Sequence, residues 1–123
     1  MSNREIIENA LKFLCNEYNF SYEYYTPNGN ADYYKYSNQY GIFTYYEWME
    51  FGESEFSVIY NQQFRKININ EEYPKMVSEF HHSHKGIKWF FKDKREDYWE
   101  MIANIIKNEI TATGTLFGIK IIN

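Results

Sequence analysis

Residues 21–48 constrain the fold more than any other part of this 123-residue chain. They contain nine of its thirteen tyrosines, and aromatic side chains alternate with polar ones along much of their length. Alternation with a period of two is typical of β-strands. The turn at residues 27–30 contains an Asn-Gly pair, which tolerates the left-handed backbone that a tight hairpin requires. This part of the chain therefore predicts antiparallel strands joined by short turns.

Further alternating segments extend this hairpin into a meander. On the long strand at residues 42–51, alternation puts Phe43 and Tyr45 on one face and Tyr46 and Trp48 on the other. Because both faces carry aromatic side chains, we expect helices on one face and either the chain itself or a partner on the other. The predicted strands are residues 20–26, 31–37, 42–51, 55–61, 64–69, 86–91 and 115–122.

Three segments predict helices. Ser2 and Glu5 form an S-x-x-E capping box at the start of the first, and Asp93 and Glu96 form a second box at the start of the last. The sequence as a whole predicts a single α+β domain over residues 1–123. It has an antiparallel meander sheet of about five to seven strands, an N-terminal helix, a short middle helix and a long helix before the last strand. The predicted helices are residues 3–17, 72–82 and 93–108.

Composition and charge exclude several classes of protein. Hydrophobic residues make up 44% of the chain, enough for a core without disulfides, and Cys15 has no second cysteine to pair with. A net charge of -4 disfavours direct binding to a nucleic-acid backbone. No apolar run reaches the roughly 18–20 residues that cross a bilayer, and the first residues do not resemble a secretion signal. We therefore expect a cytoplasmic protein with neither a nucleic-acid nor a membrane partner.

No sequence motif for catalysis is found. Phosphate-binding loops, the G-x-S-x-G elbow and H-E-x-x-H are all missing from the sequence, so we predict that the chain is not an enzyme and needs no cofactor. His81 and His84 would share a helix face and are weak candidates for metal ligands. Histidines placed at a helix C-terminus to complement its dipole are the simpler interpretation. Glu47 lies among tyrosines, where burial would suit a general acid, but a solvated acidic edge is the favoured interpretation of the pattern.

Aromatic and acidic residues together favour a protein-binding function. Tyrosine and tryptophan are enriched at interaction hot spots, and acidic neighbours would attract a basic partner. The residues predicted to bind it are Tyr45, Glu47, Glu50 and Glu53.

In size, charge and aromatic content the chain resembles the immunity proteins that bacteria pair with secreted toxins. The resemblance implies an inhibitor of a toxin or other basic protein, and no motif transfers a functional residue. Two alternatives remain open at this level. One is a homodimeric structural or assembly protein that buries its second sheet face. The other is an aromatic pocket for a small molecule or sugar.

Overall fold

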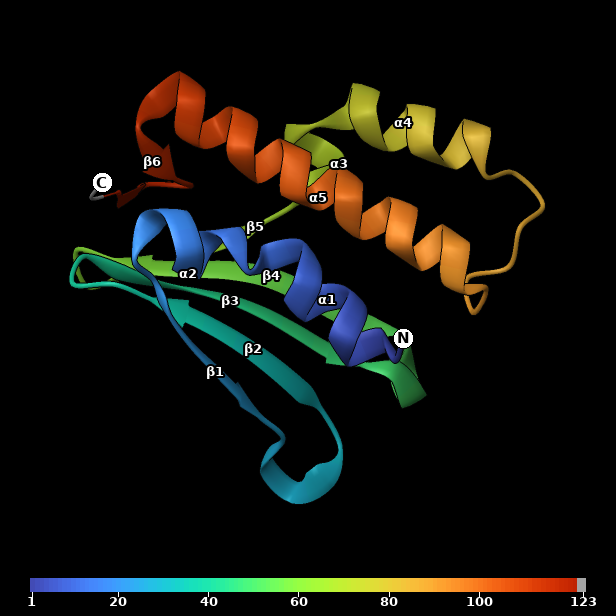
Figure 1. Cartoon of the computed structure of the whole chain (residues 1–123), viewed down its shortest axis with the longest axis horizontal. Coiled ribbons are helices and arrows are strands. Elements are labelled where there is room, and N and C mark those ends of the chain that lie inside the picture. The colour runs from blue at the N-terminus through green and yellow to red at the C-terminus, as the bar shows by residue number, and fades with distance from the viewer. Residues whose placement is uncertain (122–123) are drawn as a thin grey trace.

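The predicted meander is present in the computed structural model, which describes residues 1–121 (Figure 1). Five strands form one antiparallel sheet in the order β1-β2-β3-β4-β5, so each strand pairs with its neighbours along the chain. Two turns of 3₁₀-helix, η1 (Pro27–Gly29) and η2 (Met49–Phe51), lie at hairpin ends. The strands are β1 (Ser21–Tyr25), β2 (Asp32–Ser37), β3 (Gly41–Trp48), β4 (Glu53–Tyr60) and β5 (Gln63–Ile67).

The predicted N-terminal helix is present as two adjoining segments. They meet at Lys12, whose carbonyl accepts the Cys15 N–H at 3.0 Å in a tighter, 3₁₀-like turn. The capping box is confirmed: Ser2 Oγ accepts the Glu5 N–H, and Glu5 Oε1 accepts the Ser2 N–H, each at 3.2 Å. The helices are α1 (Asn3–Leu11), α2 (Phe13–Tyr18), α3 (Ile69–Glu72), α4 (Pro74–Ser83) and α5 (Lys92–Thr113).

All helices lie on one face of the sheet (Figure 1). Helices α1, α2 and α5 pack over the strands, and α4 lies beside α5. The core fills the space between sheet and helices, with Trp99 of α5 against Tyr45 at 4.6 Å between ring centroids. Helix α5 contributes an aliphatic stripe to this core, because Ile102, Ile106 and Ile110 are all buried. Within residues 1–121, the opposite face of the sheet carries no helix.

Two of the predicted strands are not formed as expected. Residues 86–91, predicted as a strand, consist of turns and extended backbone between α4 and α5. Residues 115–122, predicted to complete the sheet, form a separate two-stranded ribbon of β6 (Thr115–Leu116) and β7 (Ile119–Lys120). Phe117 of this ribbon packs against Phe43 at 6.2 Å on the helix side of the sheet. Ile122, the last residue of the predicted strand, lies outside the described residues.

The second predicted capping box is wrong. Helix α5 begins at Lys92 with Phe91 as its N-cap, and no side chain caps it. Asp93 therefore lies inside the first turn, where its charge complements the helix dipole.

Candidate functional site

The uncovered face of the sheet is the largest candidate site. Side chains along each strand alternate between the core and this face, and the alternation runs in register across all five strands. We call this surface the open face. Its side chains are Glu23, Tyr25, Tyr33, Lys35, Ile42, Thr44, Tyr46, Trp48, Glu53, Glu55, Ser57, Ile59, Phe64 and Lys66.

Three tyrosines form a row across one end of the open face. Tyr25 is paired with Tyr33, and Tyr33 with Tyr46, on successive strands. The first two rings stack with centroids 4.9 Å apart, and the second pair is tilted at 5.0 Å. Trp48 follows Tyr46 on β3 and packs edge-on against Phe51 at 4.5 Å. We call Tyr25, Tyr33, Tyr46 and Trp48 the tyrosine row.

The positive charges on the open face are neutralised within it. Lys35 Nζ lies 3.7 Å from Glu23, and Lys66 Nζ lies 3.2 Å from Glu55. Both pairs are solvent-exposed and contribute little to stability. They do, however, leave no unpaired lysine on this face to attract an acidic partner.

Glu50 and Glu53 supply the excess negative charge beside the tyrosine row. Glu53 accepts a hydrogen bond from the Tyr46 hydroxyl at 3.2 Å, and Glu50 lies in η2, the turn that follows Trp48. Both glutamates are exposed, and neither takes part in an ion pair within residues 1–121. This end of the open face is therefore both aromatic and acidic.

Apolar side chains occupy the opposite end of the open face. Ile59 and Phe64 face each other on β4 and β5, with Ile42 beside Ile59 on β3. Ile59 is 42% exposed and Phe64 is 58% exposed. Their exposure makes this end suitable for contact with another apolar surface.

Tyr45 and Glu47, the other two residues predicted to bind a partner, point toward the helices. They follow Phe43 at alternate positions on β3, so all three share the core face. Tyr45 is 4% exposed and Glu47 is 3% exposed. The surface available to a partner therefore contains Glu50 and Glu53 but not Tyr45 or Glu47.

Glu47 is a buried carboxyl with two hydrogen-bond donors. Tyr45 Oη donates to Glu47 Oε1 at 2.9 Å, and Asn3 Nδ2 donates to Glu47 Oε2 at 2.5 Å. Burial raises the pKa of Glu47, while the hydrogen bond from Tyr45 partly opposes that rise. Because it is enclosed between α1 and β3, this carboxyl joins the helix to the sheet and faces no open cleft.

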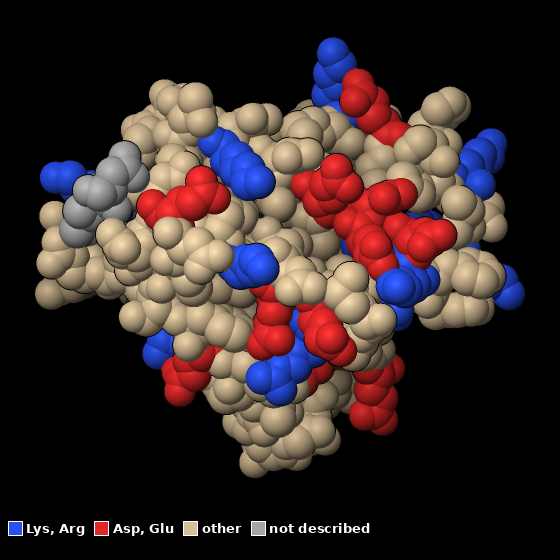
Figure 2. Space-filling model, viewed as in Figure 1, with Lys and Arg blue, Asp and Glu red and all other residues tan. Residues whose placement is uncertain are grey.

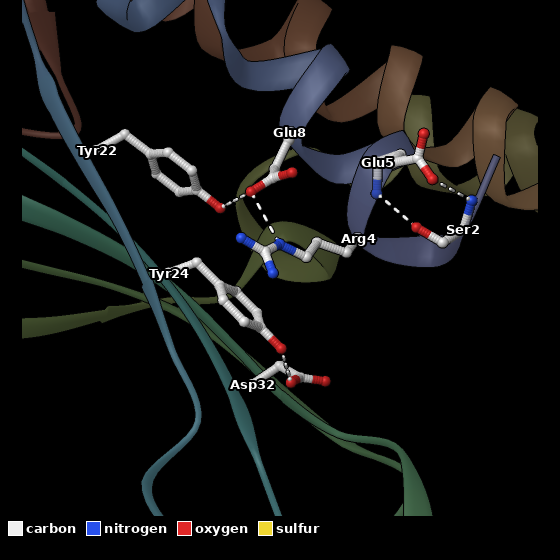
Figure 3. A network of polar contacts seen from close by, with 7 residues as sticks. All are labelled: Ser2, Arg4, Glu5, Glu8, Tyr22, Tyr24 and Asp32. Carbon is white, nitrogen blue, oxygen red and sulfur yellow. Dashed lines mark hydrogen bonds and ion pairs between the residues drawn. The ribbon is translucent and has the colours of Figure 1, made fainter. Parts of the chain in front are cut away.

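Two further tyrosines attach α1 to the edge of the sheet (Figure 3). Tyr22 donates to Glu8 Oε2 at 2.5 Å, and Arg4 Nε donates to the same oxygen at 3.1 Å. The Arg4 guanidinium lies 3.7 Å from the centroid of the Tyr24 ring, and the Tyr24 hydroxyl donates to Asp32 at 2.6 Å. These contacts fill the space between α1 and strands β1 and β2.

The sequence leaves open an aromatic pocket for a small molecule or sugar, and the structure does not bring together the rings that could line it. These rings are Tyr22, Tyr24, Tyr46, Trp48 and Tyr60. Tyr22 and Tyr24 lie on the helix side of the sheet, whereas Tyr46 and Trp48 lie on the open face. Tyr60 lies on the helix side as well, against Gly118 of the β6–β7 ribbon. These rings are on two sides of one sheet and cannot line a common cavity.

The histidines fit the helix-end interpretation. His84 Nε2 lies 2.8 Å from Asp97 Oδ2, and its Nδ1 lies 2.8 Å from the Phe80 carbonyl. The contact with Asp97 raises the pKa of His84. His81 is exposed on α4, and residues 1–121 contain no group of three or more His, Cys, Asp or Glu side chains placed to hold a metal ion.

Comparison with known proteins provides no relative. No family model, curated protein or solved structure matches this chain.

Tyr25 and Tyr33 lie on the surface of the sheet, which the sequence did not predict. Tyr25 interrupts the alternation in the first strand, and that interruption was the available signal for a tyrosine facing away from the core.

Proposed function

We propose that this chain is a small cytoplasmic protein-binding domain of the inhibitor type, similar in role to an immunity protein, which holds a basic protein against its tyrosine row. One observation carries the proposal: a complete sheet face lacks any covering element within residues 1–121 and presents an aromatic row beside unpaired carboxylates.

The chemistry of this surface suits a protein partner. Tyrosine and tryptophan bury a large area with few rotatable bonds, and their polar ends can bond to a partner's backbone. The rings of Tyr25 and Tyr33 are already stacked, so little side-chain freedom is lost on binding. A rigid aromatic row is thus pre-organised for contact.

The negative charges beside the tyrosine row favour a positively charged partner. Glu50 and Glu53 have no cationic partner within residues 1–121, and the chain carries a net charge of -4. Approaching lysines or arginines would be attracted over long range and paired on contact. A toxin nuclease or another basic protein has the required charge.

Charge reversal at the tyrosine row tests the proposal. Tagged wild-type protein should retain a stoichiometric basic partner from its native cells, and the double variant Glu50→Lys with Glu53→Lys should lose it. Glu79→Lys with Glu100→Lys is the matched control, because both residues are exposed on helices away from the open face. Partner retention by both double variants, or no stoichiometric partner of wild type, would refute the proposal.

The rings themselves are tested separately with the isolated complex. Tyr33→Ala combined with Tyr46→Ala should weaken binding by about thirty-fold or more, the loss expected when an interface hot spot is removed. A melting temperature within a few degrees of wild type shows that the fold is intact.

A homodimer is the second candidate function, favoured by the exposed apolar pair Ile59 and Phe64. Light scattering of the purified protein distinguishes a homodimer from a monomer that binds a different protein. A dimer at micromolar concentration that dissociates in the variant Ile59→Ser with Phe64→Ser would place a second copy on the open face.

A further inference from the structure

The connection between α4 and α5, residues 84–91, exposes apolar side chains that are not part of the open face. It projects beyond the ends of both helices (Figure 1). A contiguous exposed apolar patch on a soluble domain marks a site of interaction. We call the following side chains the aromatic tip: Ile87 (42% exposed), Trp89 (39%), Phe90 (64%) and Phe91 (52%).

The connection has a defined shape that holds the tip outward. The Ile87 N–H donates to the His84 carbonyl at 3.1 Å, and Lys94 Nζ donates to the Ile87 carbonyl at 2.7 Å. The Trp89 ring packs edge-on against Tyr98 at 5.2 Å. These contacts fix the backbone while the apolar side chains remain in solvent.

Positive charge surrounds the aromatic tip although the chain as a whole is acidic. Residues 85–94 contain four lysines and one aspartate. Figure 2 shows Lys and Arg side chains around uncharged atoms at the right-hand end of the molecule, where this connection lies, with a group of Asp and Glu side chains beside them. The lysines are Lys85, Lys88, Lys92 and Lys94. Lys92 pairs with Glu96 at 3.5 Å and Lys94 binds the Ile87 carbonyl, so within residues 1–121 Lys85 and Lys88 are the two left without an ion-pair or hydrogen-bond partner.

We propose that the aromatic tip inserts into the headgroup region of an anionic lipid bilayer, with Lys85 and Lys88 bound to lipid phosphates. Tryptophan and phenylalanine partition into this region, and each nearby lysine strengthens attraction to anionic lipid. No helix within residues 1–121 is long and apolar enough to span a membrane. The expectation of no membrane partner rested on the lack of such a span, which a peripheral tip does not need.

The shape of the tip favours a bilayer over single-stranded nucleic acid. Base stacking needs free aromatic faces along a groove, whereas Phe90 and Phe91 pack against each other at 4.9 Å on a projecting connection. Ile87 has no aromatic face to offer a base. Insertion into lipid, in contrast, uses aliphatic and aromatic side chains alike. This inference does not rest on the proposed function.

Vesicle flotation of the full chain tests the inference. Wild type should bind vesicles in which about a third of the phosphatidylcholine is replaced by phosphatidylglycerol, and bind pure phosphatidylcholine far less. Lys85→Gln with Lys88→Gln should lower the partition coefficient about 25-fold, since each lysine contributes about fivefold. Phe90→Ser with Phe91→Ser should lower it about tenfold or more.

Phe51→Ser with Phe64→Ser is the matched control. These phenylalanines have comparable exposure, at 61% and 58%, but lie on or beside the open face. The control should bind anionic vesicles as wild type does, while the Phe90 and Phe91 variant should still bind any protein partner.

Several outcomes would overturn the inference. They are the absence of binding to anionic vesicles, equal binding to neutral ones, and an equal loss in both phenylalanine variants. Binding to a single-stranded oligonucleotide that vesicles do not displace would also overturn it, by assigning the tip to nucleic acid. A blue shift in tryptophan emission on vesicle binding that disappears in Trp89→Phe would support insertion directly.

Discussion

Replacing Tyr45 by phenylalanine tests how the buried carboxyl of β3 is stabilised. The Tyr45 hydroxyl donates to Glu47 across 2.9 Å, and both residues are at most 4% exposed. Phenylalanine keeps the ring and its contacts with Phe56 and Trp99, at 4.8 and 4.6 Å. The substitution therefore removes one hydrogen bond to a carboxylate, a contact that contributes about 1.5–3 kcal/mol. We expect the free energy of unfolding to fall by about 2 kcal/mol when Glu47 is ionised.

The loss in free energy of unfolding caused by Tyr45→Phe should depend on pH in a defined direction. Burial raises the pKa of Glu47 in the native state above its ordinary value in the unfolded chain. Between these two pKa values the native state binds more protons than the unfolded state, so the free energy of unfolding falls as pH rises through that interval. Losing the Tyr45 donor raises the pKa of Glu47 further and steepens that fall. Near pH 4 the carboxyl is neutral in the native state, and the lost bond is worth only about 0.5–1.5 kcal/mol.

Urea unfolding at about pH 4 and about pH 8 measures this difference. In a double-mutant cycle, Tyr45→Phe should cost less than about 1 kcal/mol when Glu47→Gln is already present. Tyr46→Phe is the control, because its hydroxyl reaches Glu53 in solvent at 3.2 Å and should cost less than about 0.5 kcal/mol. Equal costs of Tyr45→Phe at the two pH values, or no coupling to Glu47, would refute this account.

Three further predictions concern stability. Ser2→Ala removes the α1 cap and should lower the free energy of unfolding by about 1 kcal/mol, measurable by urea titration. Gly118→Ala should cost more than about 2 kcal/mol, because the added Cβ would overlap the Tyr60 ring and because residue 118 has a φ of +104°. Gly29→Ala, at a φ of +69° with open space around it, should cost only about 1–2 kcal/mol. The contact with Asp97 raises the pKa of His84, so the stabilisation from this contact is present at acid pH and lost as pH rises through that raised pKa. The melting temperature of His84→Ala should lack this dependence on pH.

The sequence alone determined the meander and its helices because those signals are local. The capping box at Ser2 acts within the first turn of α1, where Ser2 Oγ accepts the Glu5 N–H. The turn at residues 27–30 uses its Asn-Gly pair, and both Asn28 and Gly29 have a positive φ. Alternation along β3 likewise separated Phe43 and Tyr45 from Tyr46 before any pairing was known. Local hydrogen bonds and a two-residue period need no tertiary information.

Only the tertiary structure decided which face of the sheet the helices cover. Both faces of β3 are aromatic, so alternation could not show that Glu47 would be buried and that Tyr46 would lie on the surface. The apolar composition of residues 86–91 indicates a strand, yet a strand also needs a partner edge, and the chain leaves these residues between two packed helices. Burial and strand pairing depend on residues distant in sequence. For that physical reason the open face and the aromatic tip emerged only from the folded chain.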